Sequence, residues 1–251
     1  MNKEEQILYN HLKDLANTAF RRNYVVFSDF LTLNEQSILL SMKENLLGIH
    51  IELEGGHTLA ERKIVCFKPI GVGSDTPTPL CLLKVEPKNS KFSDELTHRD
   101  FLGAILNLGI DRCKIGDIFV QNTTAFIICN DLIGNFICDH LIKVRHTSVD
   151  CAITDLSDFT FEPQFTTIKG SVSSTRLDAI LALAFRTSRS KITGYIESEK
   201  VFVNGKSITS NSYMLKEGDI VSARGLGKFI ISSYLSKTKK DRLFIELNLY
   251  S

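Results

Sequence analysis

Residues 173–228 constrain the fold of this chain more than any other stretch. Apolar residues recur at helical spacing over residues 177–185, and a second short helix is expected to begin at residues 187–188. Asn204 and Gly205 lie between two alternating segments and predict a two-residue β-hairpin, because both residues can take positive φ. A pair of short helices followed by a tight hairpin indicates a small, compact module.

This module lies in a strongly basic part of a chain that is nearly neutral overall. Residues 166–251 contain 14 Lys and Arg against 7 Asp and Glu, whereas the whole chain has 30 against 29. The remaining residues are therefore acidic. Such an asymmetry is typical of a protein with an anionic partner, either nucleic acid or a membrane surface. On charge alone, a solvated basic surface without a partner stays open.

Several classes of protein are disfavoured by the composition. No apolar run reaches the roughly 18–20 residues of a transmembrane helix, and the first residues lack the apolar core of a secretory signal. The six cysteines are scattered and never spaced as CxxC, so buried free thiols are expected rather than a zinc site or a redox pair. We expect a cytoplasmic protein without membrane contact, metal or cofactor.

The acidic part of the chain predicts two further domains. Helices are expected over residues 3–20 and 34–46, the second capped by Thr32 or Asn34, with strands over residues 49–53 and 63–67. A turn-rich segment, GVGSDTPTP, then forms a linker at residues 71–79.

The middle segment predicts the order β-α-β-β-α-β. This is the ferredoxin-like motif shared by many RNA-recognition folds. Phe119 and Phe126 are expected in its core rather than as platforms for bases. The predicted elements cover residues 80–85, 97–108, 117–121, 125–129, 131–142 and 148–154.

The expected fold class is therefore α+β with three domains. Residues 1–72 form a mixed N-terminal α/β domain, residues 78–156 the ferredoxin-like domain, and residues 166–251 the basic domain.

The basic domain presents cations at both predicted helix starts. Ser173 or Ser174 is expected to cap the first helix, which leaves Arg176 off the apolar face and free to point outward. Arg189 and Lys191 project from the first turn of the second helix. Cations there gain nothing from the helix dipole, so they suit an external phosphate, to which helix N–H groups also donate.

Four short motifs together resemble the RNA-binding module named after small-subunit ribosomal protein four, which contains the alpha-L RNA-binding motif. The resemblance covers residues 171–224. The stretches HRDFLGAILNLGIDRCKIGDIFV and VSARGLGKF more narrowly resemble the YlmH family of bacterial proteins. The four motifs are RLD at residues 176–178, SRSK at 188–191, VFVNGK at 201–206 and EGDIV at 217–221.

The resemblance implies a non-enzymatic protein that binds rRNA and tRNA on the large ribosomal subunit, in rescue and quality control of stalled ribosomes. The free protein is expected to be a monomer. Glu199 departs from the family pattern, which has glycine before the first strand of the module. The implied RNA-contacting residues are Arg176, Ser188, Arg189, Lys191, Asn204, Lys206, Arg224 and Lys228, with a possible second contact at His98, Arg99, Arg112 and Lys114.

Three motifs look catalytic but lack the residues that their chemistry needs. Asp178 sits in an RLD like that of pseudouridine synthases, but Ala-Ile-Leu follows it instead of Thr-Ser-Gly. His98-Arg99-Asp100 copies part of a kinase loop, yet Ile105 replaces its metal-binding Asn. The run GLGK at residues 225–228 lacks the first Gly and the final Ser or Thr of a P-loop.

No catalytic residue is therefore predicted. Two alternatives to a pure RNA-binding protein stay open. One is an RNA-modifying enzyme with an unrecognised active site in residues 1–160. The other is an adaptor whose acidic half recruits a protein partner to the ribosome.

Overall fold

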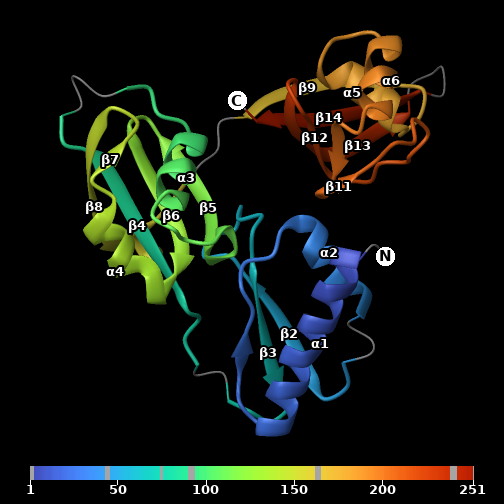
Figure 1. Ribbon diagram of the computed structural model, residues 1–251. Coiled ribbons are helices and arrows are strands. Elements are labelled where there is room, and N and C mark those ends of the chain that lie inside the picture. Colours follow the sequence, from blue (N-terminus) through green and yellow to red (C-terminus); the bar gives the residue numbers. More distant parts are fainter. Residues whose placement is uncertain are drawn as a thin grey trace. The chain divides into compact units, whose positions relative to one another are not determined.

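A computed structural model of the chain describes residues 3–42, 46–73, 76–89, 94–161, 165–237 and 242–250. The chain forms two compact units, residues 1–161 and 162–251, and each is described by itself (Figure 1). Both combine helices with sheets, so the expected α+β class is confirmed. Within the described ranges, no helix is both long and apolar enough to cross a lipid bilayer.

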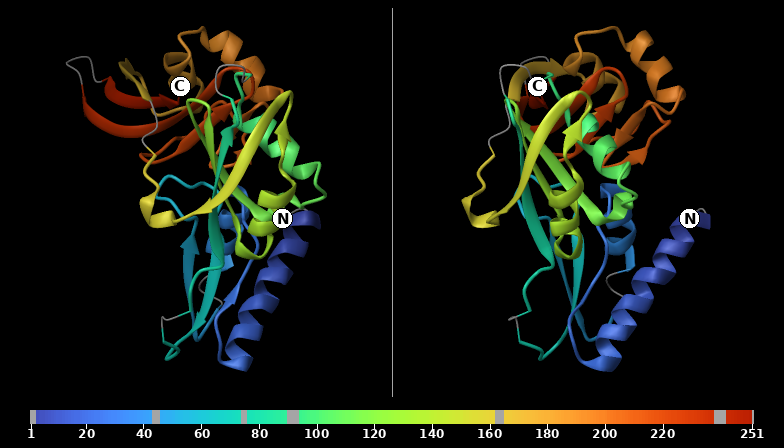
Figure 2. Two further views of the ribbon diagram at one scale, coloured as in Figure 1. Left: turned by 90° about the vertical axis from the view of Figure 1, so that its left-hand side faces the viewer. Right: turned by 60° about the vertical axis from the view of Figure 1, so that its left-hand side comes forward.

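The first unit begins with a long helix packed on a small sheet. The helix α1 lies along the three-stranded sheet β1-β3-β2 (Figures 1 and 2), and it buries Leu12, Ala16 and Ala19. These residues are spaced by four and three positions, which places them on one helix face. The elements are α1 (Lys3–Arg22), β1 (Val26–Phe27), α2 (Leu33–Met42), β2 (Ile49–Glu54) and β3 (Ile64–Pro69).

A reciprocal cap fixes the start of α2. The Thr32 N–H donates to Glu35 Oε2 at 2.6 Å, and the Glu35 N–H donates to Thr32 Oγ1 at 3.4 Å. This is a capping box, and it confirms Thr32 as one of the two predicted caps. The predicted helix runs on to residue 46, but residues 43–45 lie outside the described ranges.

The middle segment has the strand order of the predicted ferredoxin-like motif. Its sheet has the order β5-β6-β4-β8-β7, with all neighbours antiparallel. Each helix connects two strands that have one strand between them. The two-residue strand β7 was not predicted. The elements are β4 (Leu80–Pro87), α3 (His98–Leu106), β5 (Ile115–Gln121), β6 (Thr124–Asn130), α4 (Asp131–His140), β7 (Lys143–Val144) and β8 (Thr147–Thr154).

The two faces of this sheet are covered by different parts of the chain. Helices α3 and α4 cover one face through Phe101, Ile105 and Ile137. The other face packs against the N-terminal segment, because Phe30 and Ile64 share a core cluster with residues of β4, β5 and β6. The predicted boundary between residues 72 and 78 therefore lies inside the first unit, and it remains a prediction.

Both phenylalanines expected in the core are found there. Phe119 is 9% exposed, and Phe126 packs against the same cluster. The Phe119 ring lies 5.2 Å from the ring of His57 and 4.9 Å from that of Phe161. An aromatic cluster thus covers the sheet face that an RNA-recognition fold would use for stacking bases.

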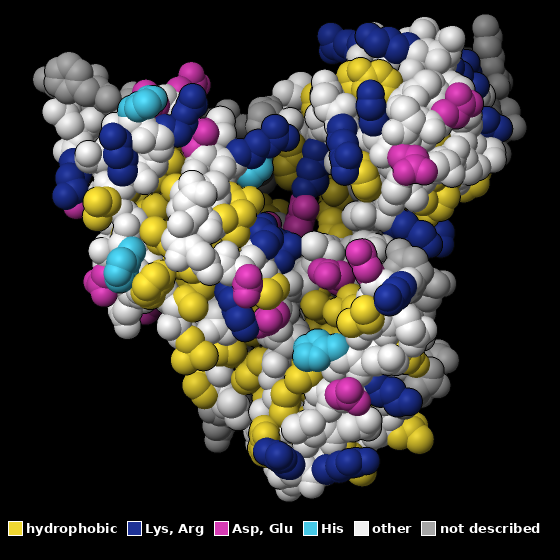
Figure 3. All heavy atoms as spheres, viewed as in Figure 1, with side chains coloured by type: hydrophobic (Ala, Val, Ile, Leu, Met, Phe, Trp, Pro, Cys, Tyr) yellow, Lys and Arg dark blue, Asp and Glu magenta, His cyan; other side chains and the backbone are white. Residues whose placement is uncertain are grey.

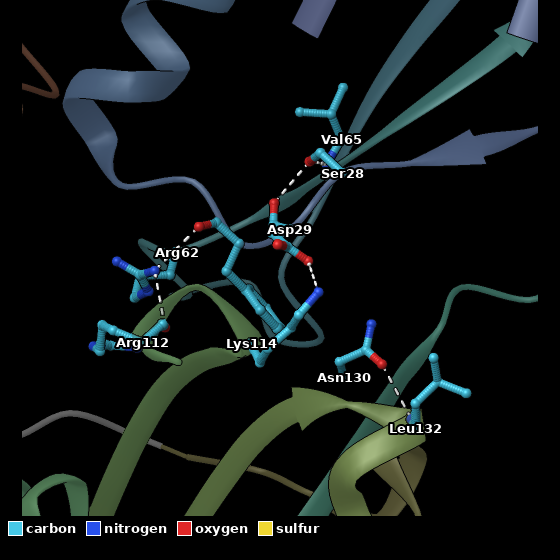
Figure 4. Close-up of polar contacts among 9 residues, drawn as sticks. Ser28, Asp29, Arg62, Val65, Arg112, Lys114, Asn130 and Leu132 are labelled. Carbon is cyan, nitrogen blue, oxygen red and sulfur yellow. Dashed lines mark hydrogen bonds and ion pairs between the residues drawn. The ribbon is translucent and has the colours of Figure 1, made fainter. Parts of the chain in front are cut away.

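Partly buried polar contacts join the N-terminal segment to the sheet. Asp117 on β5 accepts the backbone N–H groups of Glu61 at 2.6 Å and Arg62 at 2.9 Å. The Arg62 guanidinium donates to the backbone carbonyl of Ile115 at 2.9 Å. Lys114 forms an ion pair with Asp29 at 2.5 Å (Figure 4). These contacts hold the two parts of the first unit in one arrangement.

The second unit is a six-stranded sheet with two helices on one face. The strand order is β11-β10-β12-β13-β14-β9, and every neighbouring pair is antiparallel. Apolar side chains of both helices form one core with Val201, Val221 and Phe229. The elements are β9 (Phe165–Val172), α5 (Leu177–Ala184), α6 (Arg189–Glu197), β10 (Val201–Val203), β11 (Lys206–Ser207), β12 (Ile220–Ala223), β13 (Gly227–Lys237) and β14 (Leu243–Tyr250).

We expect Asp117→Ala to destabilise the first unit. The substitution leaves two backbone N–H groups without an acceptor, so the free energy of unfolding should fall by about 2–4 kcal/mol in urea denaturation. Asp150→Ala is the matched control, because Asp150 is 73% exposed and its ion pair with Lys88 is worth little. Equal effects of the two substitutions would contradict a structural role for Asp117.

Candidate nucleic-acid interface

The start of α5 is built around a nearly buried carboxylate. Asp178 is 6% exposed, and it accepts two hydrogen bonds from Arg176, Nε to Oδ1 at 3.0 Å and Nη2 to Oδ2 at 3.2 Å. Burial alone raises the pKa of Asp178, but the bonds from Arg176 and the nearby charge of Arg189 outweigh it and leave that pKa below its usual value. Asp178 is therefore a charged residue at the start of the helix.

The predicted serine caps of α5 are wrong. Arg176 takes the N-cap position, without a side-chain hydrogen bond to the helix backbone. The start of the helix is held instead by a neighbouring loop, because the Leu177 N–H donates to the Tyr213 carbonyl at 2.8 Å. Ser173 instead contacts α6, because its hydroxyl accepts a hydrogen bond from Arg189 Nη2 at 3.1 Å.

The start of α6 lies beside the start of α5. Ser188 is its N-cap, and Ser188 Oγ accepts the backbone N–H of Lys191 at 3.3 Å. The Arg189 and Lys191 side chains are exposed. Through its contact with Ser173 and its effect on Asp178, Arg189 connects the two helix starts. The structure thus brings Arg176 and Arg189 to two adjacent helix starts, with Lys191 exposed in the first turn of α6.

Asn204 holds the hairpin in place. Its backbone φ is +49°, as the predicted turn requires, and its side-chain Nδ2 donates to Asp219 Oδ1 at 2.8 Å. Asn204 Oδ1 accepts the backbone N–H of Ile220 at 3.0 Å. Both ends of the amide are engaged inside the module, whereas the neighbouring Lys206 is exposed.

Arg224 and Lys228 lie on the opposite face of the sheet from the helices. Lys228 is directly across from Ser222, which is directly across from Phe202, so the three side chains share a face. The Arg224 guanidinium lies 4.8 Å from the centre of the Phe202 ring. The buried neighbours of these residues point to the helix-covered core. The eight predicted contacts therefore occupy two faces rather than one.

Lys228 is partly buried, unlike the exposed Arg189, Lys191, Lys206 and Arg224. Its Nζ lies 4.9 Å from the centre of the Tyr250 ring, and burial lowers its pKa to about 8.

Sequence reasoning missed Arg186, which is exposed between the two helices with a φ of +47°. The only available signal for it was its position between two predicted helices. Lys and Arg side chains are prominent over the second unit, in the upper right of Figure 3.

Two of the four residues of the predicted second contact are engaged by partners within the first unit. Arg112 donates to the Ile115 and Gly116 carbonyls, and burial lowers its pKa to about 10. Lys114 is paired with Asp29, and that hydrogen bond raises the lysine pKa. Figure 4 shows Arg62 beside Arg112 and Lys114 beside Asp29.

The other two residues, His98 and Arg99, are exposed at the start of α3. Partial burial of the His98 ring lowers its pKa, and the charges of Arg99 and Arg112 lower it further. Arg99 also lines a groove of about 510 Å³ between α3 and the segment from α4 to β7. Lys143 and Arg145 line the same groove.

Arg145 is held at this groove by an acid of α3. Its Nε lies 3.8 Å from Asp100 Oδ1, and Asp100 also accepts the Thr97 N–H at 2.9 Å. Sequence reasoning missed Lys143 and Arg145, although both follow a predicted helix in the run LIKVRH. Asp100 is thus a helix-capping residue.

Comparisons with known proteins match both units. Residues 80–158 match the profile described as the putative RNA-binding domain in YlmH, and residues 175–221 match the S4 domain. The chain is 31% identical over 219 residues to the ribosome-associated protein quality control protein P2 of Bacillus subtilis, covering 86% of this chain and 83% of the relative. The chain belongs to the YlmH family.

A solved structure supports the fold assignment. The cell division protein ylmH from Streptococcus pneumoniae superposes with a TM-score of 0.52 at 20% sequence identity. The match covers 64% of this chain and 97% of that one. At this identity the likeness shows the fold alone. In this YlmH-family chain, the first matched region contains Arg99, Lys143 and Arg145, and the second contains Arg176, Arg189, Lys191 and Lys206.

Glu199 explains how the module closes without the family's glycine. Its φ is +55°, so it adopts the left-handed conformation that glycine favours at a helix end. The Glu199 N–H donates to the Ile196 carbonyl at 3.1 Å, and the Lys200 N–H donates to the Tyr195 carbonyl at 3.1 Å. The helix therefore ends in the usual way, but with a strained residue and an added negative charge.

We expect Glu199→Gly to raise the free energy of unfolding by about 0.5–1 kcal/mol, because glycine relieves the left-handed strain. The measurement is chemical denaturation of the second unit's transition. Glu197→Gly is the control: it removes the same charge from within α6 and should destabilise by up to about 1 kcal/mol. Stabilisation by both variants would show that charge, not backbone conformation, is responsible.

Proposed function

We propose that this YlmH-family protein is a non-catalytic RNA-binding protein of ribosome-associated quality control. Its partners in this proposal are rRNA and tRNA on the large ribosomal subunit, so it acts in the cytoplasm, and it is a monomer when free. The name of the Bacillus subtilis relative, which describes that protein as ribosome-associated, supports this role. The observation that carries the proposal is the convergence of Arg176, Arg189 and Lys191 on two adjacent helix starts.

The residues at the two helix starts and in the hairpin have different roles in this proposal. Arg189 and Lys191 are exposed beside the first backbone N–H groups of α6, so their side chains and the backbone can donate to one phosphate. Arg176 forms a two-point ion pair with Asp178, which fixes the position of its guanidinium beside the helix start. Asn204 keeps the hairpin turn in shape and thereby presents Lys206.

Two acids that lie in catalytic-looking motifs, Asp178 and Asp100, both have structural roles. This supports the absence of catalysis in the proposal. Asp178 is bound to Arg176 at a helix start, with little room for a substrate beside its carboxylate. Asp100 accepts the Thr97 N–H as a helix cap and pairs with Arg145. Both acids hold cations in place.

The groove beside α3 is a second RNA contact in this proposal. Arg99, Lys143 and Arg145 supply its positive charge, and they replace Arg112 and Lys114 of the sequence prediction. The groove lies in the part of the chain that matches the putative RNA-binding domain. It gives the otherwise acidic first unit a local site for phosphates.

We expect the double variant Arg189→Ala/Lys191→Ala to lose co-sedimentation with large ribosomal subunits. Removing two phosphate contacts should weaken binding about tenfold or more at physiological salt. It should also lower the slope of log affinity against log salt by about 2. Sucrose-gradient sedimentation and fluorescence anisotropy at several salt concentrations measure the two quantities.

The matched control for that variant is Lys13→Ala/Arg21→Ala on α1. It removes the same two side-chain types from exposed positions of the first unit. Arg176→Ala is unsuitable for this test, because it would leave Asp178 nearly buried without its partner. Unchanged sedimentation of the Arg189→Ala/Lys191→Ala variant would overturn the proposed interface.

The groove is tested by Arg99→Ala/Lys143→Ala, which leaves the ion pair of Arg145 intact. We expect a further loss of affinity of about threefold to tenfold when it is combined with Arg189→Ala/Lys191→Ala. Lys84→Ala/Lys88→Ala on β4 and just after it is the charge-matched control in the same unit. An affinity equal to that of the control would exclude the groove as a contact.

A further inference from the structure

The helix-free face of the six-stranded sheet carries an aromatic row. Phe202 on β10, Tyr250 on β14 and Phe165 on β9 all point to this face. Phe202 alternates with the buried Val201 and Val203. Tyr250 lies directly across from Phe165, with their ring centres 5.0 Å apart. All three rings are half-buried rather than enclosed in the core.

Cations accompany the rings. The Arg224 guanidinium lies over the Phe202 ring at 4.8 Å, and the Lys228 ammonium lies over the Tyr250 ring at 4.9 Å. These two cations follow the proposed phosphate-binding residues in sequence, but strand alternation places them on the other face of the sheet. The helix-covered interface therefore does not account for them.

The charge of this face suits a polyanion. Lys169 on β9 is on the same face and forms an ion pair with Glu246 on β14 at 2.7 Å, so these two charges cancel. Arg224 and Lys228 then give the described part of the face a positive balance. Burial lowers the pKa of Lys228 to about 8, and a neighbouring phosphate would favour its charged form.

We propose that this face binds an unpaired segment of RNA, whose bases stack on Phe202 and Tyr250 while Arg224 and Lys228 contact its phosphates. Aromatic rings with adjacent cations are the features that single-stranded nucleic acids use, because every base has a flat face for stacking. The two rings are three strands apart, or about 14 Å, so they hold separate bases of one strand.

This inference deepens the proposed function and rests on it in one respect, that the protein binds RNA. It adds a different recognition chemistry. The helix starts use phosphate contacts and suit folded RNA, whereas the sheet face requires bases that are free to unstack. The protein would then hold a folded RNA and an adjacent single strand on the two faces of one module.

The test uses the full chain and two labelled RNAs of equal length, an unstructured oligouridine and a stable hairpin. The variant Phe202→Leu/Tyr250→Leu keeps apolar side chains but removes the stacking surfaces. We expect its affinity for oligouridine, measured by fluorescence anisotropy, to fall at least tenfold, because each base stack contributes about 1–3 kcal/mol. Its affinity for the hairpin should stay within about twofold of the unsubstituted protein.

The matched control is Phe20→Leu/Tyr24→Leu, which changes two exposed aromatic residues of the first unit, with Tyr24 also beside an arginine. It should bind both RNAs as the unsubstituted protein does. Should Phe202→Leu/Tyr250→Leu fail to fold, ultraviolet crosslinking of oligouridine to the unsubstituted protein decides the matter. Crosslinks at Phe202 or Tyr250 support the inference, and crosslinks confined to other segments overturn it.

The outcomes separate the inference from the proposed function. Loss of hairpin binding in Arg189→Ala/Lys191→Ala, with oligouridine binding absent or insensitive to Phe202 and Tyr250, overturns the inference and leaves the proposed function standing. The opposite result is oligouridine binding that depends on Phe202 and Tyr250, together with hairpin binding that the Arg189→Ala/Lys191→Ala variant leaves unchanged. That result overturns the proposed function and leaves the inference standing.

Discussion

The cationic face of the second unit depends on the ion pair between Asp178 and Arg176. Asp178 is almost buried at the start of α5, where it binds Arg176 through two hydrogen bonds and lies near the charge of Arg189. The Asp178 carboxylate interacts favourably with the charges of both arginines. A buried carboxylate would in turn be costly without the arginines. This ion pair and the loop near residue 213 together hold the start of α5, and Arg189 connects it to the start of α6.

The sheet then divides the remaining charge between two surfaces. Side chains of a strand alternate between faces, so Lys228 points away from the helices although its neighbour Phe229 is fully buried beneath them. Arg224 is on the same side through its contact with Phe202. One basic stretch of chain therefore presents a helix-bearing face suited to phosphates and a flat aromatic face suited to bases. The same alternation that builds the core generates both.

In the first unit, several cations serve the fold rather than a ligand. Arg62, Arg112 and Lys114 bind backbone carbonyls or Asp29, where the N-terminal segment packs on the sheet. Burial and the nearby charge of Arg62 lower the pKa of Arg112 to about 10. Three other cations of this unit, Arg99, Lys143 and Arg145, line the groove beside α3, where Asp100 holds Arg145.

Features set by short-range pattern were predictable from the sequence. Helical spacing located α1, α3 and α4, and the Asn204-Gly205 pair located the hairpin, because propensity and turn chemistry act within a few residues. The strand order of the ferredoxin-like motif followed from the alternation of elements. The caps were less predictable, since α5 is held by a loop near residue 213 that no local signal connects to it.

The sequence by itself determined the family, the α+β class and the concentration of positive charge in the second unit. Only the tertiary structure decided which of these charged side chains can contact RNA. Lys114 is paired with Asp29, which is 85 residues away, and the Asn204 amide is engaged by Asp219. A charge in a sequence carries no information about such partners, because they are brought together only when distant segments pack. For the same reason, the two faces of the sheet, and with them the aromatic row, emerged only from the register of the strands.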